Sequence, residues 1–282
     1  MYSYEFGGEI VSWEKWNYNL RIIGKRNVGY NKVVKTFTDA KTVELFDVVK
    51  VERWKDGFFC DVIRENVNAG NVVLKELGFR EIKISSEQIH LVGCDFFERN
   101  FPGLDLAGKV YNGHAYIENK MTEVETVGVL SHEIAHLFSY SAILAIVSGD
   151  DGRNKEFGSL RLGMTFFPRN RKPQETLYDA ISELLTEMFA NRIREISMRS
   201  RREEINERHP YYEYVKYFRK ILGKIAGSKI GTEKLENDFL KDYITGSYSA
   251  LKKVVLKYPK TAPYFAKMTH GESLDEIYEI VK

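Results

Sequence analysis

Two histidines and a glutamate carry the chemistry that this chain suggests most strongly. They stand in the segment His132-Glu133-Ile134-Ala135-His136, an HExxH pattern. Residues four apart share one face of a helix, so both imidazoles can bind a single metal ion. Glu133 lies one step further round the helix, where it can take a proton from a water on that metal. The segment therefore predicts a zinc site for hydrolysis, with Glu133 as the general base.

This chemistry needs a helix, and the flanking sequence predicts one. Thr122-Glu123-Val124-Glu125 has the form of a capping box, which satisfies backbone N–H groups where a helix begins. The alternative is a surface helix with two solvated histidines, or a core histidine held by a hydrogen bond. Apolar residues at helical spacing favour the metal site, because they leave both histidines on a separate face: Val127, Leu130, Ile134, Leu137 and Phe138.

A catalytic zinc usually has three protein ligands and one open position for water, so a third ligand is required. A metzincin would extend the motif to HExxHxxGxxH, but this chain has Ser139 and Ala142 where that pattern needs Gly and His. The third ligand must therefore come from another part of the chain.

The next strongly helical segment offers acidic candidates. Asp179, Glu183 and Glu187 are four residues apart, so they line one helix face and repel one another unless a cation offsets their charge. A bound metal would do so. The alternative is an acidic, solvated face paired with Arg192 and Arg194. The basic run over residues 192–202 is expected to be a solvated helix end.

The segment Ser182-Glu183-Leu184-Leu185-Thr186-Glu187 resembles the glutamate-helix pattern NExx(S/T)(D/E) of the gluzincins, the thermolysin-like zinc peptidases. In that family the pattern follows the HExxH helix, and its first acid is the third metal ligand. The resemblance implies that Glu183 joins His132 and His136 on zinc. It also implies that Glu187 accepts a hydrogen bond from a zinc-bound histidine. Ser182 departs from the family's usual Asn.

A looser resemblance, over about residues 80–250, links the chain to a group of small bacterial zinc peptidases. It rests on residues 185–190, 212–215 and 239–248. Gluzincins use a Tyr, His or Arg besides the metal to stabilise the oxyanion. The candidates here are Tyr178, His209, Tyr212 and Tyr248, of which the looser resemblance favours Tyr212 and Tyr248.

The resemblance implies an α+β, zincin-like fold, with a small mixed sheet, an active-site helix and a mainly helical C-terminal subdomain. We expect three parts: a β-rich segment over residues 1–55, the subdomain of the HExxH helix over 56–147, and the helical subdomain of the glutamate helix over 148–282. A hydrophobic content of 43% in 282 residues is enough for a sizeable core.

Local patterns predict the elements that position the site. We expect a helix over residues 62–77 ended by Gly78, a strand over 81–92, a short helix over 95–100 and a strand over 107–118. The strand over 107–118 is expected to be a sheet edge that can pair with extended substrate, with an ordinary edge strand as the alternative. His114 on this strand could reach the site.

The second half of the chain is predicted to be mainly helical. Residues 148–172 are expected to form a loop or hairpin over the cleft, and the glutamate helix is expected to begin near Pro173. Further helices are predicted after Pro210, over residues 211–225, 233–243, 247–258 and 273–281.

Charge and cysteine content indicate which partners and which cellular compartment to expect. The 42 basic and 40 acidic side chains nearly cancel, so the charge balance predicts binding to neither nucleic acid nor membranes. No apolar run has the length of a membrane span or the form of a secretory signal. Two cysteines, Cys60 and Cys94, suit a reducing compartment in which each is a small buried hydrophobe. These features predict a cytoplasmic protein whose partner is a peptide or protein substrate.

Together the patterns predict a zinc metallopeptidase that hydrolyses peptide bonds with Glu133 as general base. One alternative is a catalytically inactive protein of the same fold that presents its cleft to a partner. Another is an intracellular regulatory protease with a single target. The intact Glu133 favours an enzyme. Zinc is expected from the ligand types, although manganese, cobalt or nickel can bind similar donor sets.

Overall fold

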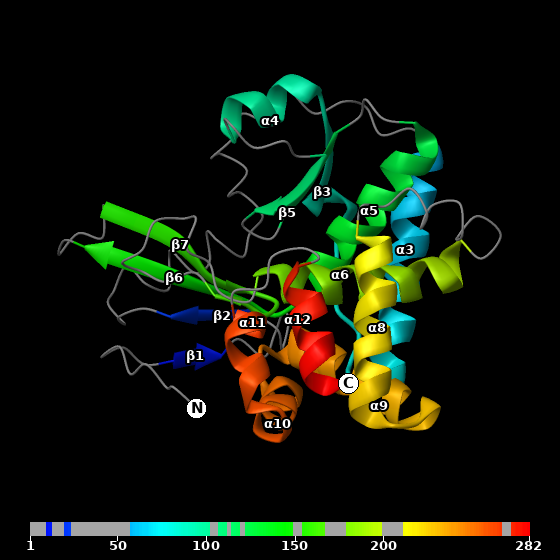
Figure 1. Cartoon of the computed structure of the whole chain (residues 1–282). Helices are drawn as coiled ribbons and strands as arrows, with labels where there is room; N and C mark the ends of the chain where they lie inside the picture. Colours follow the sequence, from blue (N-terminus) through cyan, green and yellow to red (C-terminus); the bar gives the residue numbers. More distant parts are fainter. Residues whose placement is uncertain are drawn as a thin grey trace.

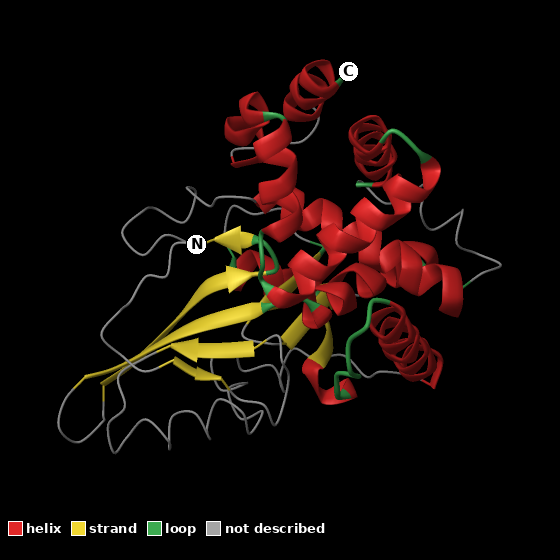
Figure 2. Ribbon diagram, turned by 90° about the horizontal axis from the view of Figure 1, so that it is seen from below, coloured by secondary structure: helices red, strands yellow, loops and turns green. Residues whose placement is uncertain are grey.

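The computed structural model describes residues 10–12, 20–23, 57–101, 107–111, 114–118, 122–148, 154–166, 179–198, 211–266 and 272–282. Within these ranges the chain is a mixed, mainly helical α+β structure, with most strands on one side and most helices on the other (Figures 1 and 2). The elements are β1 (Ile10–Ser12), β2 (Leu20–Ile23), α3 (Gly57–Glu76), η2 (Ser86–Gln88), β3 (Ile89–Val92), α4 (Cys94–Asn100), β4 (Gly108–Tyr111), β5 (His114–Glu118), α5 (Glu123–Phe138), β6 (Ser141–Ser148), β7 (Asn154–Leu162), β8 (Thr165–Phe166), α6 (Asp179–Ser197), α8 (Tyr212–Ala226), α9 (Lys229–Thr245), α10 (Ser249–Lys257), η3 (Pro259–Thr261), α11 (Ala262–Ala266) and α12 (Glu272–Val281).

The described strands form two sheets. A three-stranded sheet has the order β3-β5-β4, with β3 parallel and β4 antiparallel to β5, so β4 lies at an edge. A five-stranded sheet has the order β1-β2-β6-β7-β8, in which only β2 and β6 run parallel. Both β4 and β5 pack against α5, so the small sheet supports the helix that carries the HExxH segment.

Helix α5 begins where its sequence predicts. The Thr122 hydroxyl accepts a hydrogen bond from the Glu125 N–H at 3.4 Å, and the Glu125 carboxylate accepts one from the Thr122 N–H at 2.9 Å. This capping box satisfies two backbone donors that a helix N-terminus otherwise leaves unpaired. The predicted apolar stripe is buried, and Ile134 and Phe138 are completely inaccessible to solvent.

Helix α3 lies against both α5 and α6, and Gly70 sets how closely it approaches. A Cβ added to Gly70 would lie 2.2 Å from Cε2 and 2.5 Å from Cζ of Phe138. The ring is fully buried, so it has little room to move.

We expect Gly70→Ala to lower the free energy of unfolding by about 1–2 kcal/mol, because overpacking outweighs the gain in helix propensity. Urea denaturation measures the change. Gly223→Ala in α8 is the matched control, since its Cβ would meet only Thr232 Oγ1, at 3.7 Å. The control is expected to be neutral or stabilising by up to about 1 kcal/mol. A Gly70→Ala protein as stable as wild type would contradict the close packing.

Two predicted strands are shorter than expected. Residues 81–92 yield a strand only over Ile89–Val92, because Ser85 and Gln88 form their own capping box around η2. The single strand predicted over 107–118 is wrong, since β4 and β5 are two antiparallel strands of a hairpin. The sequence Asn112-Gly113 separates them, and this pair is typical of tight hairpin turns.

Residues 141–166 form more sheet than predicted. The predicted loop or hairpin over 148–172 includes the antiparallel pair β7 and β8, whereas strand β6 was not predicted. The described part of the N-terminal segment, β1 and β2, joins this sheet through β6. The predicted start of the glutamate helix at Pro173 lies outside the described residues, and the three-part division of the chain stays a prediction.

The helices after residue 211 confirm the prediction made from the spacing of apolar residues. Helices α8, α9, α10 and α12 correspond to the four segments predicted after Pro210. Helix α9 begins earlier than predicted, at Lys229, because the Ser228 hydroxyl accepts a hydrogen bond from the Gly231 N–H at 3.1 Å. None of the described helices has both the length and the apolar character needed to cross a membrane.

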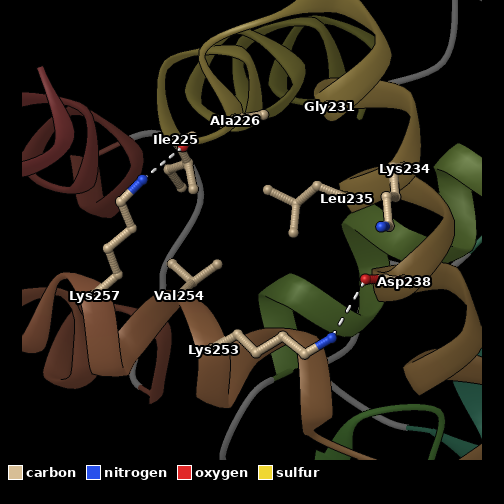
Figure 3. Close-up of a pocket in the computed structure, with 9 residues that line it drawn as sticks. All are labelled: Ile225, Ala226, Gly231, Lys234, Leu235, Asp238, Lys253, Val254 and Lys257. Carbon is tan, nitrogen blue, oxygen red and sulfur yellow. Dashed lines mark hydrogen bonds and ion pairs between the residues drawn. The ribbon is translucent and has the colours of Figure 1, made fainter.

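A groove of about 290 Å³ opens between α8, α9 and α10 (Figure 3). Lys253 crosses one side of it and lies 3.6 Å from the carboxylate of Asp238. Its lining contains none of the predicted site residues and consists of Ile225, Ala226, Gly231, Lys234, Leu235, Asp238, Lys253, Val254 and Lys257.

Candidate metal centre

Three potential metal ligands meet where α5 packs against α6. His132, His136 and Glu183 each offer an atom, and these atoms lie within 4.8 Å of one another. Glu183 Oε2 is 3.0 Å from His132 Nε2 and 3.3 Å from His136 Nε2. The ligand atoms of a tetrahedral zinc ion with bonds of about 2.0–2.1 Å lie about 3.3 Å apart. The two spacings from Glu183 therefore suit ligands of one small metal ion.

The local structure of each helix explains this convergence. The four-residue spacing on α5 places the two imidazoles side by side, with ring centroids 4.9 Å apart. On α6 the apolar residues Ile181, Leu184 and Leu185 are buried in the core, which turns Glu183 toward α5. The histidine side chains are 7% exposed and that of Glu183 is 23% exposed. The cluster is therefore largely shielded, with the carboxylate of Glu183 closest to solvent.

The electrostatics of the cluster favour positive charge. Burial by itself lowers the pKa of His132, but hydrogen bonds to Glu183 and Glu187 outweigh it and raise this pKa to about 10. Burial raises the pKa of Glu183, yet the charges and hydrogen bonds of His136 and His132 outweigh it, so this pKa lies well below its ordinary value. The carboxylates of Glu183 and Glu187 therefore favour a positive charge at this place, which a divalent cation can supply.

Glu133 is buried beside the cluster with one oxygen unsatisfied. The residue is 6% exposed, and its Oε2 has no hydrogen-bond partner among the described residues. Burial is the largest influence on Glu133 and raises its pKa. An unpaired buried oxygen is costly, so it indicates a place for a partner such as a metal-bound water. The donor set, its spacing and this oxygen fit a catalytic metal ion.

The side chain of Glu187 supports His132 from behind. Glu187 Oε2 lies 3.1 Å from His132 Nδ1, which leaves Nε2 directed at the cluster. The other carboxylate oxygen pairs with Arg194, and neither Glu187 nor Arg194 is exposed to solvent. The solvated acidic face considered as an alternative is therefore wrong for Glu187. The solvated helix end expected over residues 192–202 is wrong for Arg194 as well.

A different network supports His136, and the sequence patterns did not predict it. Thr186 Oγ1 lies 3.3 Å from His136 Nδ1 and 2.7 Å from the Tyr243 hydroxyl, which donates in turn to the Ala135 carbonyl at 3.3 Å. Burial raises the pKa of Tyr243, so its hydroxyl stays neutral. The Ser/Thr position of the glutamate-helix pattern was the available signal for Thr186. The Ser182 hydroxyl accepts from the Met164 N–H instead, at 3.2 Å.

The tyrosine candidates have other described contacts. The Tyr248 hydroxyl donates to the Met164 carbonyl at 2.7 Å, and the ring of Tyr212 lies under Lys216 Nζ at 4.1 Å. Tyr178 and His209 lie outside the described residues. The ring of Tyr211, which the sequence analysis did not single out, stacks on His132 with centroids 5.6 Å apart and an interplanar angle of 14°.

Two further residues differ from expectation. His114 does not join the cluster, because it is buried in β5 with its Nδ1 3.0 Å from His90 Nε2. Cys60 was expected to be buried, but it is a free and exposed thiol near the start of α3. The side chain of Cys94 lies outside the described residues.

The edge strand β4 approaches Glu133, the expected general base, closely at Gly108. A Cβ at this position would lie 2.7 Å from Glu133 Oε1 and 2.6 Å from Val129 Cγ1. We expect Gly108→Ala to displace the Glu133 carboxylate and to lower kcat by about 10-fold or more, since catalysis is sensitive to small misplacements. Metal affinity should not change, because Glu133 is not among the three candidate ligands. Steady-state kinetics and a zinc titration of the same variant check this, and unchanged kcat would contradict it.

Comparisons with protein-family models, with curated proteins and with solved structures gave no match.

Proposed function

We propose that this protein is a zinc-dependent metallopeptidase of the gluzincin type, in which His132, His136 and Glu183 hold the metal. The observation that carries the proposal is the convergence of these three ligands beside the unsatisfied carboxylate of Glu133. Two histidines and one carboxylate are the donor set of a catalytic rather than a structural zinc site, and Glu133 lies beside them as a base.

In this proposal zinc, when bound, lowers the pKa of a water ligand and polarises the substrate carbonyl. Glu133 takes the proton from that water on its carboxylate and delivers it to the leaving amine. Its buried surroundings raise its pKa toward the range in which a carboxylate can both accept and release a proton. Tyr211 is our candidate for the oxyanion donor, because its ring stacks on His132 with centroids 5.6 Å apart.

A protein that only binds a partner has no need for Glu133. A buried, unpaired carboxylate oxygen lowers stability without serving a binding role, so it favours catalysis over the inactive-protein alternative. A regulatory protease with one target shares all these residues. It differs from a general peptidase in substrate, which the metal centre does not determine.

Metal removal tests the proposal. We expect the protein to cleave members of a peptide library, to lose this activity after dialysis against a chelator, and to regain it with one equivalent of zinc. Cleavage by protein shown to be free of metal would contradict the proposal. Full zinc occupancy without library cleavage would favour a single target or a binding role. Comparison of new N-termini in cells with the wild type and with Glu133→Gln would then separate these two.

A further inference from the structure

We propose that Arg194 is a positioning residue of the metal centre, which acts on His132 through the carboxylate of Glu187. The inference rests on the proposed metal site but does not require hydrolysis. It concerns a residue two helical turns beyond Glu187 on α6, in a segment whose charge pattern predicted only solvated side chains.

The burial of Arg194 calls for an explanation. It is completely inaccessible to solvent and is among the largest side chains buried to this degree. Its guanidinium stays charged in a protein, so its place in the interior depends on close, well-oriented partners. Such a group is costly to retain if an apolar side chain would pack equally well.

The partners of Arg194 connect it to both helices of the metal centre. One terminal nitrogen pairs with Glu187 Oε1 and also donates to Asn191 Oδ1 at 3.0 Å. The other terminal nitrogen donates to the Gly128 carbonyl at 3.5 Å. Gly128 is four residues before His132, on the same face of α5. The guanidinium therefore bridges α6 to the turn of α5 that precedes the first histidine.

Glu187 carries this constraint to the candidate ligand. Its Oε1 is held by Arg194 and its Oε2 lies 3.1 Å from His132 Nδ1, so both oxygens have a fixed partner. A carboxylate held at both oxygens cannot rotate, and it fixes the orientation and the tautomer of the imidazole. The imidazole of His132 is then held with its Nε2 facing Glu183 and His136. On His136 the corresponding nitrogen, Nδ1, lies 3.3 Å from the neutral hydroxyl of Thr186, which contacts Tyr243 in turn.

A purely structural role would stabilise the fold without affecting the metal. To separate the roles, we would measure zinc affinity by competition with a chromophoric chelator, and the visible spectrum of the cobalt-substituted protein, which reports ligand geometry. Arg194→Met is expected to weaken zinc affinity by about 10- to 100-fold, which is the usual effect of removing a residue that holds a metal ligand in place. Leu251→Ala, which leaves a cavity at a buried position of α10, is the control for lost stability and should leave affinity and spectrum unchanged.

Non-additivity tests the route through Glu187. In a Glu187→Gln background, Arg194→Met should cause little further loss of zinc affinity, because both substitutions break the same chain of contacts. Arg194→Lys, which retains the charge without the planar fork, should bind zinc with intermediate affinity. This second variant keeps the test open if Arg194→Met does not fold.

Each outcome decides a separate claim. Unchanged zinc affinity and cobalt spectrum in a destabilised Arg194→Met protein would overturn the positioning role and leave the proposed function intact. Additive losses in the double variant would overturn the route through Glu187. A wild-type protein that binds no metal would overturn both the inference and the proposed function.

Discussion

Glu133→Gln is expected to retain zinc and to lose about 10²- to 10⁴-fold in kcat, the contribution of a positioned general base. Gln has nearly the same shape but cannot accept the proton. Glu133 is buried beside the candidate ligands and its Oε2 is unpaired among the described residues, so the substitution removes the proposed base without removing a structural partner. The free energy of unfolding should be unchanged or slightly higher, since a buried ionisable group becomes neutral.

Steady-state kinetics on a cleaved peptide, with zinc content and urea denaturation of the same sample, check this prediction. Glu195→Gln is the control, because Glu195 is an exposed acid on α6. Wild-type kcat in Glu133→Gln would end the proposed mechanism. Loss of zinc together with activity would make Glu133 a ligand, which its geometry does not favour.

Glu183→Ala is expected to weaken zinc binding by more than about 100-fold, beyond the loss caused by removing a partner behind a ligand. Glu183 Oε2 lies 3.0 Å from His132 Nε2 and 3.3 Å from His136 Nε2, so it is close to both imidazoles. The stabilisation of the fold by bound zinc should disappear when this carboxylate is removed. For the wild type this stabilisation is about 4 kcal/mol at a zinc concentration of 1,000 times Kd.

Competition with a chelator gives the affinity, and thermal unfolding with and without zinc gives the stabilisation. Glu195→Ala is the matched control on the same helix and should behave as the wild type. If Glu183→Ala keeps wild-type affinity, the third ligand lies elsewhere and the glutamate-helix resemblance does not apply to this residue.

The helices were predictable because their signals are local. The capping box of Thr122 and Glu125 and the apolar stripe that follows it determine α5 without reference to the rest of the chain. The same holds for the helices after residue 211. The two histidines come together for the same reason, since a four-residue spacing on a helix is already a spatial relation.

The surroundings of the site depend on distant pairings that periodicity does not contain. The bond between Thr186 and Tyr243 joins residues 57 apart, and that between Arg194 and Gly128 joins residues 66 apart. Arg194 belongs to a run of charged residues in the sequence, yet its contacts with Glu187 and with the Gly128 carbonyl of α5 lie in the interior. The hairpin of β4 and β5 is different, because the Asn-Gly pair was a usable local signal for it.

The central claim is that His132, His136 and Glu183 bind one zinc ion. X-ray absorption at the zinc edge, on wild-type protein purified without added metal or chelator, tests it most directly. We predict one zinc per chain with only nitrogen and oxygen neighbours at about 2.0–2.1 Å and the multiple scattering of two imidazoles. A protein that contains no metal and does not bind added zinc would contradict the account. A sulfur neighbour at about 2.3 Å, as the exposed Cys60 could provide, would contradict it as well.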